Sequence, residues 1–394
     1  MKIFISVIML KDIGGISTST VNLLSEIAHE HDVTLCVLGD YISEDIKLPK
    51  NVKIIKGSKI LKDCYCDRDM LSQQTNFQKT VRSIRRLARR LIGTEKIVNY
   101  AIKKVKVPEE YDVAIAYSND IYAENGKLIA GGVNSFVLKN VKATKKISWI
   151  HNDAKKIGFT KELCIKMFKD YDAIVNVSYD CKYVFDEIIL EFTNKSFVVY
   201  NMFDLDVIKE KAEDHNPYEN NGKIHFVTVA RLYNHQKRID RIIETVHRLK
   251  TEGYTNFDWT IVGEGGDRQM LEEQISEKNV GDIITLAGLK QNPYPYVKNA
   301  DAFVLTSTYE GYPMTVKEAQ IVGAPTLVTE YGSAYEQVED GVDGLVCDNS
   351  VDGVYDMIKK VLDDKNIISD LRKNLEENPI TNKKALEQFT DVCK

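Results

Sequence analysis

The sequence predicts an α/β protein with two doubly wound domains in tandem. Short apolar runs alternate with stretches of helical periodicity along the whole chain, which is the pattern of repeated strand-helix units. The runs are continuously apolar, as parallel strands covered by helices on both faces are. A polar stretch at 210–222, with the Asn, Gly and Pro content of a surface loop, separates two series of such runs. Each series therefore predicts one doubly wound domain.

The expected strands can be placed by residue number. The first series has apolar runs at 3–10, 33–38, 112–117, 146–150, 173–177 and 196–200, and the second at 224–230, 259–263, 283–288, 302–306 and 325–329. A break at Pro379 is followed by a helix-start signal near the end of the chain. We therefore expect an N-terminal domain at 1–203, a C-terminal domain at 204–378 and a separate helix at 379–394.

The composition excludes several classes of protein. The 394 residues are 43% hydrophobic and 28% charged, which is typical of a globular chain of two or three domains and not of a disordered one. The formal net charge of −5 excludes a polycation for nucleic acid, so we expect no nucleic-acid partner. No apolar run approaches the roughly 18 residues of a membrane-spanning helix.

Two features favour a cytoplasmic location. The apolar run at 3–10 leads into Lys11 and then a glycine pair rather than a small-residue cleavage site, so we interpret it as a buried strand and not as a signal peptide. The seven cysteines are scattered and include no Cys-x-x-Cys pair, so we expect reduced thiols.

Gly14 and Gly15 directly follow the first expected strand and open a helix. Such a glycine loop lets the backbone approach a ligand closely, and the free N–H groups of a helix N-terminus attract anions. Neither the Gly-x-Gly-x-x-Gly fingerprint nor a P-loop is present. A tight strand-to-helix turn is the alternative, and the pattern does not separate the two.

Two cations, Arg231 and Lys237, follow the first expected strand of the second domain. An arginine fork and a lysine point charge at a strand exit can bracket a diphosphate. The alternative is a pair of solvated surface cations, which is the expected reading for any single pair in a chain with 53 Lys and Arg residues.

The segment 307–325 is more informative. A strand ends near Thr306, Gly311 supplies a flexible turn, and Pro313 suits the first turn of a helix. Glu310 therefore lies in the loop before the helix and Glu318 lies inside it. Free N–H groups at the helix start can grip phosphate oxygens, and a carboxylate can accept two hydrogen bonds from ribose hydroxyls. The alternatives are a favourable charge near a helix N-terminus for Glu310 and an exposed helix face for Glu318.

Glu310 and Glu318, with seven residues between them, resemble the E-x7-E signature of the family 4 retaining glycosyltransferases that build bacterial glycans. The order of the other motifs agrees, from the glycine pair through the two cations to the segments 263–271, 287–291, 299–313 and 329–347. The resemblance is collinear over 224–347 and weaker at 1–30 and 146–153. The chain differs at Ala230 and Arg238, where the family often has glycine.

The resemblance implies the GT-B fold, in which two Rossmann-like domains face each other across a cleft and the C-terminal helix packs on the N-terminal domain. It implies that Arg231 and Lys237 neutralise the donor diphosphate, that Glu318 binds the nucleotide ribose and that Glu310 lies near the donor sugar. The implied donor site also includes Gly14, Gly15, Gly263, Leu289, Gly311, Tyr312, Pro313, Met314 and Thr315.

His151 follows an expected strand, at the position where the family commonly has a histidine near the donor sugar and the acceptor. The resemblance therefore implies a catalytic role for His151 beside Glu310, Arg231 and Lys237, and it makes Asn152 and Asp153 candidates for acceptor contact. The alternative for a histidine at a strand end is a structural hydrogen bond.

The expected activity is transfer of a hexose or N-acetylhexosamine from a UDP-sugar to a glycan or glycoconjugate, in cell-surface polysaccharide biosynthesis. The family implies same-face attack with retention of configuration and no bound metal, so we expect no cofactor. Two Asp-x-Asp sequences, at 67–69 and 204–206, mimic a metal motif, and we interpret them as chance in an acidic chain. A UDP-sugar epimerase and a non-catalytic sugar-nucleotide-binding subunit are the alternatives.

The stretch 79–106 is strongly basic, with apolar residues at helical spacing. A basic amphipathic helix suits peripheral contact with anionic lipid at the inner face of the cell membrane, where a lipid-linked acceptor would be presented. The alternative is a helix packed on the first domain with a solvated basic face.

Overall fold

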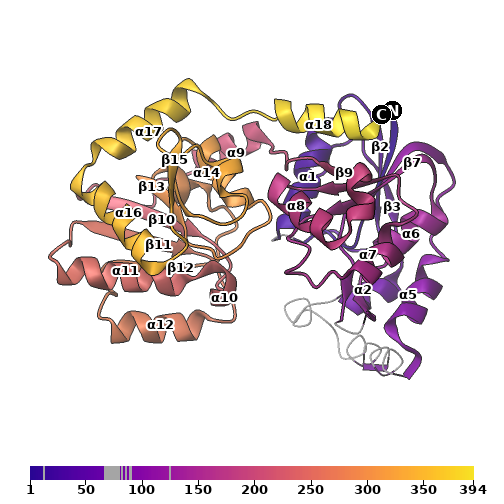
Figure 1. Cartoon of the computed structure of the whole chain (residues 1–394), viewed down its shortest axis with the longest axis horizontal. Helices are drawn as coiled ribbons and strands as arrows, with labels where there is room; N and C mark the ends of the chain where they lie inside the picture. The colour runs from indigo at the N-terminus through magenta and orange to yellow at the C-terminus, as the bar shows by residue number, and fades with distance from the viewer. Residues whose placement is uncertain (12–13, 66–79, 81–82, 85–86, 88–90, 124–125) are drawn as a thin grey trace. The chain divides into compact units, whose positions relative to one another are not determined.

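The computed structural model describes residues 1–11, 14–65, 80, 83–84, 87, 91–123 and 126–394. It divides into two compact units, unit 1 with Met1–Met202 and Lys383–Lys394, and unit 2 with Phe203–Asn382. Figure 1 labels the elements of each unit along the chain. Among the described residues, no helix has both the length and the apolar character needed to cross a bilayer.

Unit 1 is built on a seven-stranded sheet within the described residues, in the order β3-β2-β1-β4-β7-β8-β9, and its strand pairs are parallel. The strands are β1 Lys2–Val7, β2 Asp32–Val37, β3 Lys53–Lys56, β4 Glu110–Ala116, β7 Lys142–Ile150, β8 Ala173–Asn176 and β9 Ser196–Val198. The helices are α1 Gly15–Ile27, α2 Lys59–Tyr65, α5 Thr94–Ile102, α6 Val133–Asn140, α7 Lys161–Phe168 and α8 Tyr179–Ile188, with a 3-10 turn at Leu190–Lys195 and a small hairpin of β5 Ile121–Tyr122 and β6 Leu128–Ala130.

The continuous apolar runs of the sequence form the buried strands of this sheet. β1 is buried from Ile3 to Val7 and pairs with β2 on one side and β4 on the other. The strand order therefore reverses beside β1, and in such sheets ligands bind beyond the carboxyl ends of the strands at the point of reversal.

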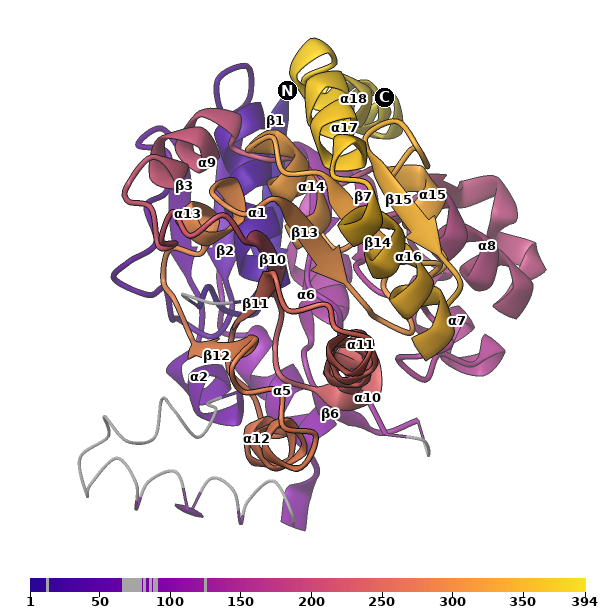
Figure 2. The same ribbon diagram turned by 90° about the vertical axis from the view of Figure 1, so that its left-hand side faces the viewer.

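Unit 2 repeats this architecture with a six-stranded parallel sheet in the order β12-β11-β10-β13-β14-β15. The strands are β10 Ile224–Val229, β11 Phe257–Val262, β12 Ile284–Gly288, β13 Ala302–Leu305, β14 Thr326–Thr329 and β15 Gly344–Cys347. The helices are α9 Leu205–Ala212, α10 Asn234–Lys237, α11 Ile239–Thr251, α12 Arg268–Glu277, α13 Tyr294–Lys298, α14 Met314–Ile321, α15 Ala334–Gln337, α16 Val351–Asp363 and α17 Asn366–Glu377. In unit 2 the order reverses between β10 and β13 (Figure 2).

The last helix, α18 (Lys383–Cys393), is part of unit 1. Its Gln388 side chain accepts a hydrogen bond from the backbone N–H of Tyr200 at 3.0 Å. Its buried Phe389 ring lies 6.4 Å from the ring of Trp149. The chain therefore returns to its first unit after completing the second.

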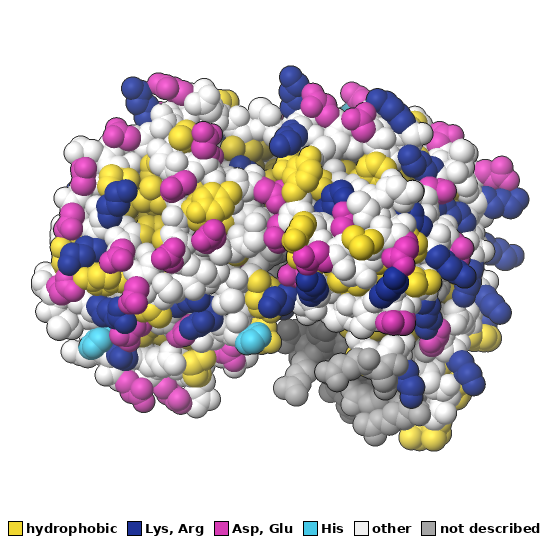
Figure 3. Space-filling model, viewed as in Figure 1, with side chains coloured by type: hydrophobic (Ala, Val, Ile, Leu, Met, Phe, Trp, Pro, Cys, Tyr) yellow, Lys and Arg dark blue, Asp and Glu magenta, His cyan; other side chains and the backbone are white. Residues whose placement is uncertain are grey.

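The surface is mixed in charge. On the face shown in Figure 3, acidic and basic side chains are interspersed over each unit, as the small net charge of −5 indicates. The predicted class, α/β with two Rossmann-like doubly wound units, is confirmed.

Candidate functional site

The candidate site of unit 2 lies at the carboxyl ends of neighbouring strands. β10 pairs directly with β13, so the segment that follows each strand leaves the sheet at the same edge. The segment after β10 contains Arg231 and Lys237, and the segment after β13 contains Glu310 and leads into α14. The sheet topology therefore brings together two motifs that are more than 60 residues apart in the sequence.

The central contact joins Lys237 and Glu310. Lys237 Nζ lies 2.6 Å from Glu310 Oε1, and the two side chains are only 15% and 9% exposed. Ser307 Oγ donates a second hydrogen bond to the same oxygen at 2.6 Å, and Gln236 Nε2 donates to Oε2 at 3.2 Å. A nearly buried ion pair needs further hydrogen bonds to offset the lost water, and Ser307 and Gln236 supply two of them to the Glu310 carboxylate.

The backbone around this ion pair is also fixed by hydrogen bonds. The Thr306 hydroxyl donates to the carbonyls of Lys237 and Arg238 at 2.9 and 3.0 Å. The Thr308 N–H donates to the carbonyl of Gln236 at 2.8 Å, and the buried Arg241 donates to the carbonyl of Thr306 at 3.0 Å. The two loops therefore form one connected structure, which presents Lys237 and Glu310 in a set geometry.

The one-turn helix α10 ends at Arg238, which has φ 50° and ψ 48°. A residue with a side chain pays on the order of 1 kcal/mol for this left-handed conformation, which glycine adopts more easily. Arg238 is held by a double contact with Asp240, with Nε and Nη2 each 2.9 Å from a carboxylate oxygen. The turn that ends α10 is therefore kept although glycine is absent.

Arg231 lies in a different environment from Lys237. It is exposed at the end of β10, and its guanidinium carbon lies 5.5 Å from the centre of the Tyr233 ring. Gly263, at the end of β11, has φ 145°, and a Cβ there would meet the carbonyl oxygen of Ala230 at 1.9 Å. Only glycine fits this close approach. Leu289 follows β12 and is 50% exposed, so these predicted donor-site residues end three adjacent strands.

The remaining predicted residues of unit 2 lie in the loop before α14 and in the first turn of that helix. Gly311 and Tyr312 are buried, Pro313 is the N-cap residue, and Met314 and Thr315 begin the helix. The sequence predicts Pro313 in the first turn of the helix. In the structure it is the N-cap residue, one position before the helix begins. Its φ of −61° leads the chain into the helix.

Glu318, inside α14, is buried and lacks the close cation that Glu310 has. It is 8% exposed, and Tyr294 Oη lies 3.3 Å from its Oε1. Burial raises the pKa of Glu318 to about 7, against the opposing effects of the Tyr294 hydrogen bond and the charge of Lys211. The alternative interpretation of Glu318 as part of an exposed helix face is therefore wrong, because α9 and α13 pack against α14.

In unit 1, His151 lies at the end of β7, and its Nε2 is 2.6 Å from the carbonyl oxygen of Tyr117. A carbonyl only accepts, so Nε2 carries a proton and donates it. Burial lowers the pKa of His151 to about 4, with the hydrogen bond to Tyr117 opposing it. The ring is therefore a neutral imidazole at pH 7, and its Nδ1 is the nitrogen able to accept.

The other predicted residues of unit 1 are close to the surface. Gly14 and Gly15 are exposed where α1 begins, and Asn152 is exposed after β7. The carboxylate of Asp153 accepts a hydrogen bond from the N–H of Lys156 at 3.0 Å, which is a local turn contact. These residues belong to unit 1, and the predicted diphosphate and ribose residues belong to unit 2.

Two Asp-x-Asp sequences, at 67–69 and 204–206, resemble a metal-binding motif. The carboxylate of Asp204 accepts from the N–H of Val207 at 3.2 Å and so caps α9, while 67–69 lies outside the described residues. Across the described ranges, no three His, Cys, Asp or Glu side chains are grouped so that they could hold a metal ion.

The basic segment 79–106 is described only in part, because 79, 81–82, 85–86 and 88–90 lie outside the described residues. Its last part forms α5, which buries Val98, Ala101 and Ile102 in the core of unit 1. Membrane contact by the earlier part therefore stays a prediction.

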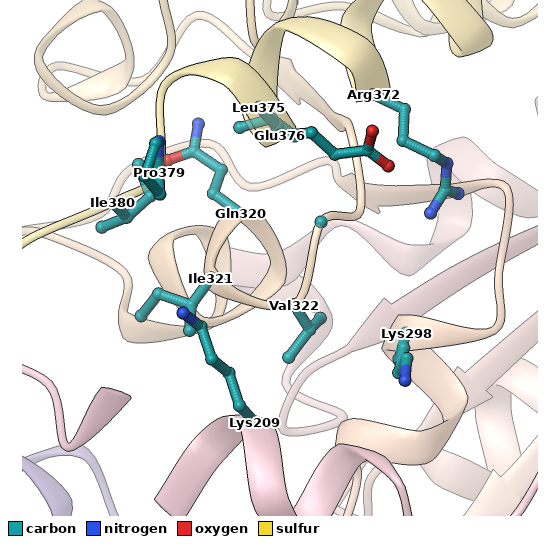
Figure 4. Close-up of a pocket in the computed structure, with 11 residues that line it drawn as sticks. Lys209, Lys298, Gln320, Ile321, Val322, Arg372, Leu375, Glu376, Pro379 and Ile380 are labelled. Carbon is teal, nitrogen blue, oxygen red and sulfur yellow. The ribbon is translucent and has the colours of Figure 1, made fainter. Parts of the chain in front are cut away.

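Unit 2 also contains a cavity of about 400 Å³ beside the C-terminal end of α14 and the helix α17 (Figure 4). None of the predicted site residues lines it. Arg372 donates to the carbonyls of Ala300 and Asp301, and Lys298 forms an ion pair with Glu213. These cations are therefore already partnered within unit 2.

Part of the chain matches a known protein family. Residues 209–381 match the family Glycosyl transferases group 1. This range contains every predicted site residue of unit 2, so the resemblance to glycosyltransferases is confirmed there. Assignment to family 4 and retention of configuration stay predictions.

Three relatives show how far the similarity extends. An uncharacterized glycosyltransferase of Methanocaldococcus jannaschii, MJ1059, is 27% identical over 253 residues, and the aligned region is 61% of each chain. Alpha-monoglucosyldiacylglycerol synthase of Acholeplasma laidlawii is 25% identical over 97% of this chain and 92% of its own length. A second M. jannaschii glycosyltransferase, MJ1178, is matched over 53% of its length, so the chain spans about three fifths or less of the length of these two archaeal relatives.

Solved structures match the whole chain. Anabaena HepE in complex with UDP and glucose gives a TM-score of 0.68 at 15% identity, over 100% of this chain and 99% of that one. TarM gives a TM-score of 0.71 at 14% identity, over 100% and 98%. At these identities the likeness shows the fold, and the predicted GT-B fold is confirmed.

The neutral state of His151 makes a prediction about pH. The pKa is about 4 in the folded protein and 6.5 in the unfolded chain, so the unfolded state binds more protons between these values. Stability from this group is therefore lost as pH falls from about 7, by about 2 kcal/mol at pH 5. We expect His151→Asn, which keeps an N–H donor, to lose less stability than the wild type over this interval.

The measurement is urea unfolding at pH 7 and pH 5, followed by the fluorescence of Trp149 in a Trp259→Phe background, since the chain has two tryptophans. Equal loss of stability in the wild type and in His151→Asn would contradict the neutral imidazole.

Proposed function

We propose that the protein is a retaining, metal-independent glycosyltransferase that moves a hexose or N-acetylhexosamine from a UDP-sugar to a glycan or glycoconjugate. The observation that carries the proposal is the Lys237–Glu310 pair at the joined ends of β10 and β13, in the part of unit 2 that matches the family. HepE has been solved with UDP-glucose, and a relative from Escherichia coli is named a galactosyltransferase that uses UDP-Gal and a diphosphoundecaprenol acceptor. These names support a UDP-sugar donor and a role in cell-surface polysaccharide biosynthesis.

Lys237 would stabilise the leaving group. The bond between the anomeric carbon and the diphosphate breaks, a bond to the acceptor hydroxyl forms, and the hydroxyl proton passes to the leaving phosphate as UDP departs. Negative charge develops on the diphosphate, and a fixed cation in a dry site stabilises it. Glu310 balances the charge of Lys237 in the structure. The donor diphosphate would be a second anion for the same ammonium group, with the exposed Arg231 as a further cation.

Glu310 would lie near the donor sugar, where its charge favours the positive charge that develops at the anomeric carbon. Its Oε1 already accepts hydrogen bonds from Lys237 and Ser307, and such bonds make a carboxylate oxygen a weaker nucleophile. This supports same-face attack by the acceptor over a covalent intermediate on Glu310. His151, neutral and with Nδ1 able to accept, would orient a hydroxyl and would not supply a proton.

Glu318 would bind the ribose through its carboxylate. The N–H groups of Met314 and Thr315 at the start of α14 would bind the phosphates, with Gly311, Tyr312 and Pro313 forming the adjacent loop. A UDP-sugar epimerase is the alternative from the sequence, and it differs in needing no acceptor. Glycosyl transfer is therefore tested with and without an acceptor, by following UDP release and the anomeric configuration of the product by NMR.

Substitutions of the two donor-binding residues test the proposal. We expect Lys237→Ala and Glu318→Ala each to lower kcat/KM at least about tenfold, equal to about 1.4 kcal/mol, because each removes a contact to the donor. UDP release from a panel of UDP-sugars with glycan acceptors measures the effect. Lys278→Ala, which breaks a surface ion pair with Glu244 on α11, is the matched control, and circular dichroism checks the fold. Wild-type kinetics in both site variants would refute the donor site.

Removal of divalent metal tests the leaving-group mechanism. If Lys237 and Arg231 alone stabilise the departing diphosphate, EDTA leaves the initial rate of UDP release unchanged. A loss of activity that Mg²⁺ or Mn²⁺ restores would show that a metal ion shares this role.

We also propose that the basic segment 79–106 makes peripheral contact with the inner face of the cell membrane through the part that precedes α5, since its sequence is basic and amphipathic. The cytoplasmic location follows from the nucleotide-sugar donor. Sedimentation with phosphatidylglycerol vesicles should capture the protein and phosphatidylcholine vesicles should not, and equal partitioning would contradict an electrostatic membrane contact.

A further inference from the structure

We propose that Tyr294 is a positioning residue for nucleotide binding, because its hydroxyl holds one oxygen of Glu318 and leaves the other oxygen for the ribose of the donor. This inference rests on the proposed function and extends it to a residue outside the E-x7-E motif. Tyr294 is 24 positions before Glu318 in the sequence, on a different helix.

The geometry of the Glu318 carboxylate supports this role. Tyr294 Oη lies 3.3 Å from Oε1, and Oε2 has no hydrogen-bond donor among the described residues. Each carboxylate oxygen has two lone-pair positions, so three positions stay open when Tyr294 occupies one. Two ribose hydroxyls can therefore donate to Glu318 while the tyrosine bond is kept.

The Tyr294 ring is held firmly enough to direct its hydroxyl. It packs against an apolar cluster in which Phe203, Ile208 and Ile321 are buried. Asn292 fixes the start of the same helix, because its side chain accepts from the N–H of Tyr294 at 3.3 Å and donates to the carbonyl of Lys211 at 2.8 Å. Helices α9, α13 and α14 therefore pack against one another (Figure 2), and Glu318 lies on the last of them.

A buried carboxyl group without a donor would become protonated and lose an acceptor position. Burial raises the pKa of Glu318 to about 7, and the hydrogen bond from Tyr294 and the charge of Lys211 on α9 lower it. The charge of Asp204, the N-cap of α9, contributes to a raised pKa of Tyr294. The neighbouring strands β13 and β14 contain no titratable side chain. Tyr294 thus favours the ionised carboxylate, which is the form that accepts both ribose hydroxyls.

The test uses Tyr294→Phe in the full-length protein, because phenylalanine keeps the ring in the apolar cluster and removes only the hydroxyl. Isothermal titration calorimetry with UDP at pH 6, 7, 8 and 9 measures affinity. Without the hydroxyl the pKa of Glu318 is higher and its carboxylate loses the hydrogen bond that holds it, so we expect affinity for UDP about fivefold to tenfold weaker at pH 7. The difference from the wild type should be smaller at pH 9, where Glu318 is ionised in both proteins. The KM for the UDP-sugar should rise more than kcat falls.

Two further variants make the result specific. Glu318→Gln cannot ionise. In that background the substitution Tyr294→Phe should therefore change the affinity for UDP by the same factor at every pH. Tyr296→Phe, on the same helix, is the matched control and should bind UDP as the wild type does.

The outcomes separate this inference from the proposed function. Unchanged UDP affinity in Tyr294→Phe, alongside a clear loss in Glu318→Ala, overturns the role of Tyr294 and leaves the donor site standing. A loss of the same size in Tyr294→Phe and in the control Tyr296→Phe indicates a packing role and also overturns it. Failure of the wild type to bind UDP at all would overturn the proposed function itself.

Discussion

The ion pair between Lys237 and Glu310 is the contact on which the architecture of unit 2 depends. It joins the loops that follow two adjacent parallel strands, and almost no solvent reaches it. Removing two charges from water costs several kcal/mol per ion unless hydrogen bonds replace the lost water. Ser307 and Gln236 supply these bonds, and Thr306 and its backbone partners hold the loops at the required distance. The site is therefore preorganised before any ligand binds.

The two glutamates of the motif are kept in different electrostatic states. Glu310 lies against a cation and two further donors, whereas Glu318 is buried with a tyrosine hydroxyl as its neighbour. Two carboxylates whose surroundings differ in this way can serve different tasks in one site. In the proposed mechanism the charge of Glu310 lies next to the reacting sugar, and the ionised carboxylate of Glu318 accepts the ribose hydroxyls.

In unit 1, His151 is a neutral imidazole at the end of β7. Its proton is committed to the carbonyl of Tyr117, and the ring packs edge-on against the Tyr117 ring at 4.6 Å. The same tyrosine hydroxyl lies 2.5 Å from Ser19 on α1, so the ends of β4 and β7 and the first helix are tied together. The orientation of this histidine is thus set by the core of unit 1 and not by its exposed loops.

The sequence by itself determined the fold class, the strands at the centre of each sheet and the motif residues of unit 2, because continuous apolar runs and the seven-residue spacing of Glu310 and Glu318 are local patterns. It did not reveal the edge strands β3 and β15, whose short segments carry weaker apolar patterns. The partners of the motif residues were also hidden. Gln236 and Ser307 matter because strand pairing brings their loops together, and Tyr294 matters because α9 and α13 cover α14 and bury Glu318. Burial and hydrogen-bond partners depend on which distant segments pack together, so only the tertiary structure decided them.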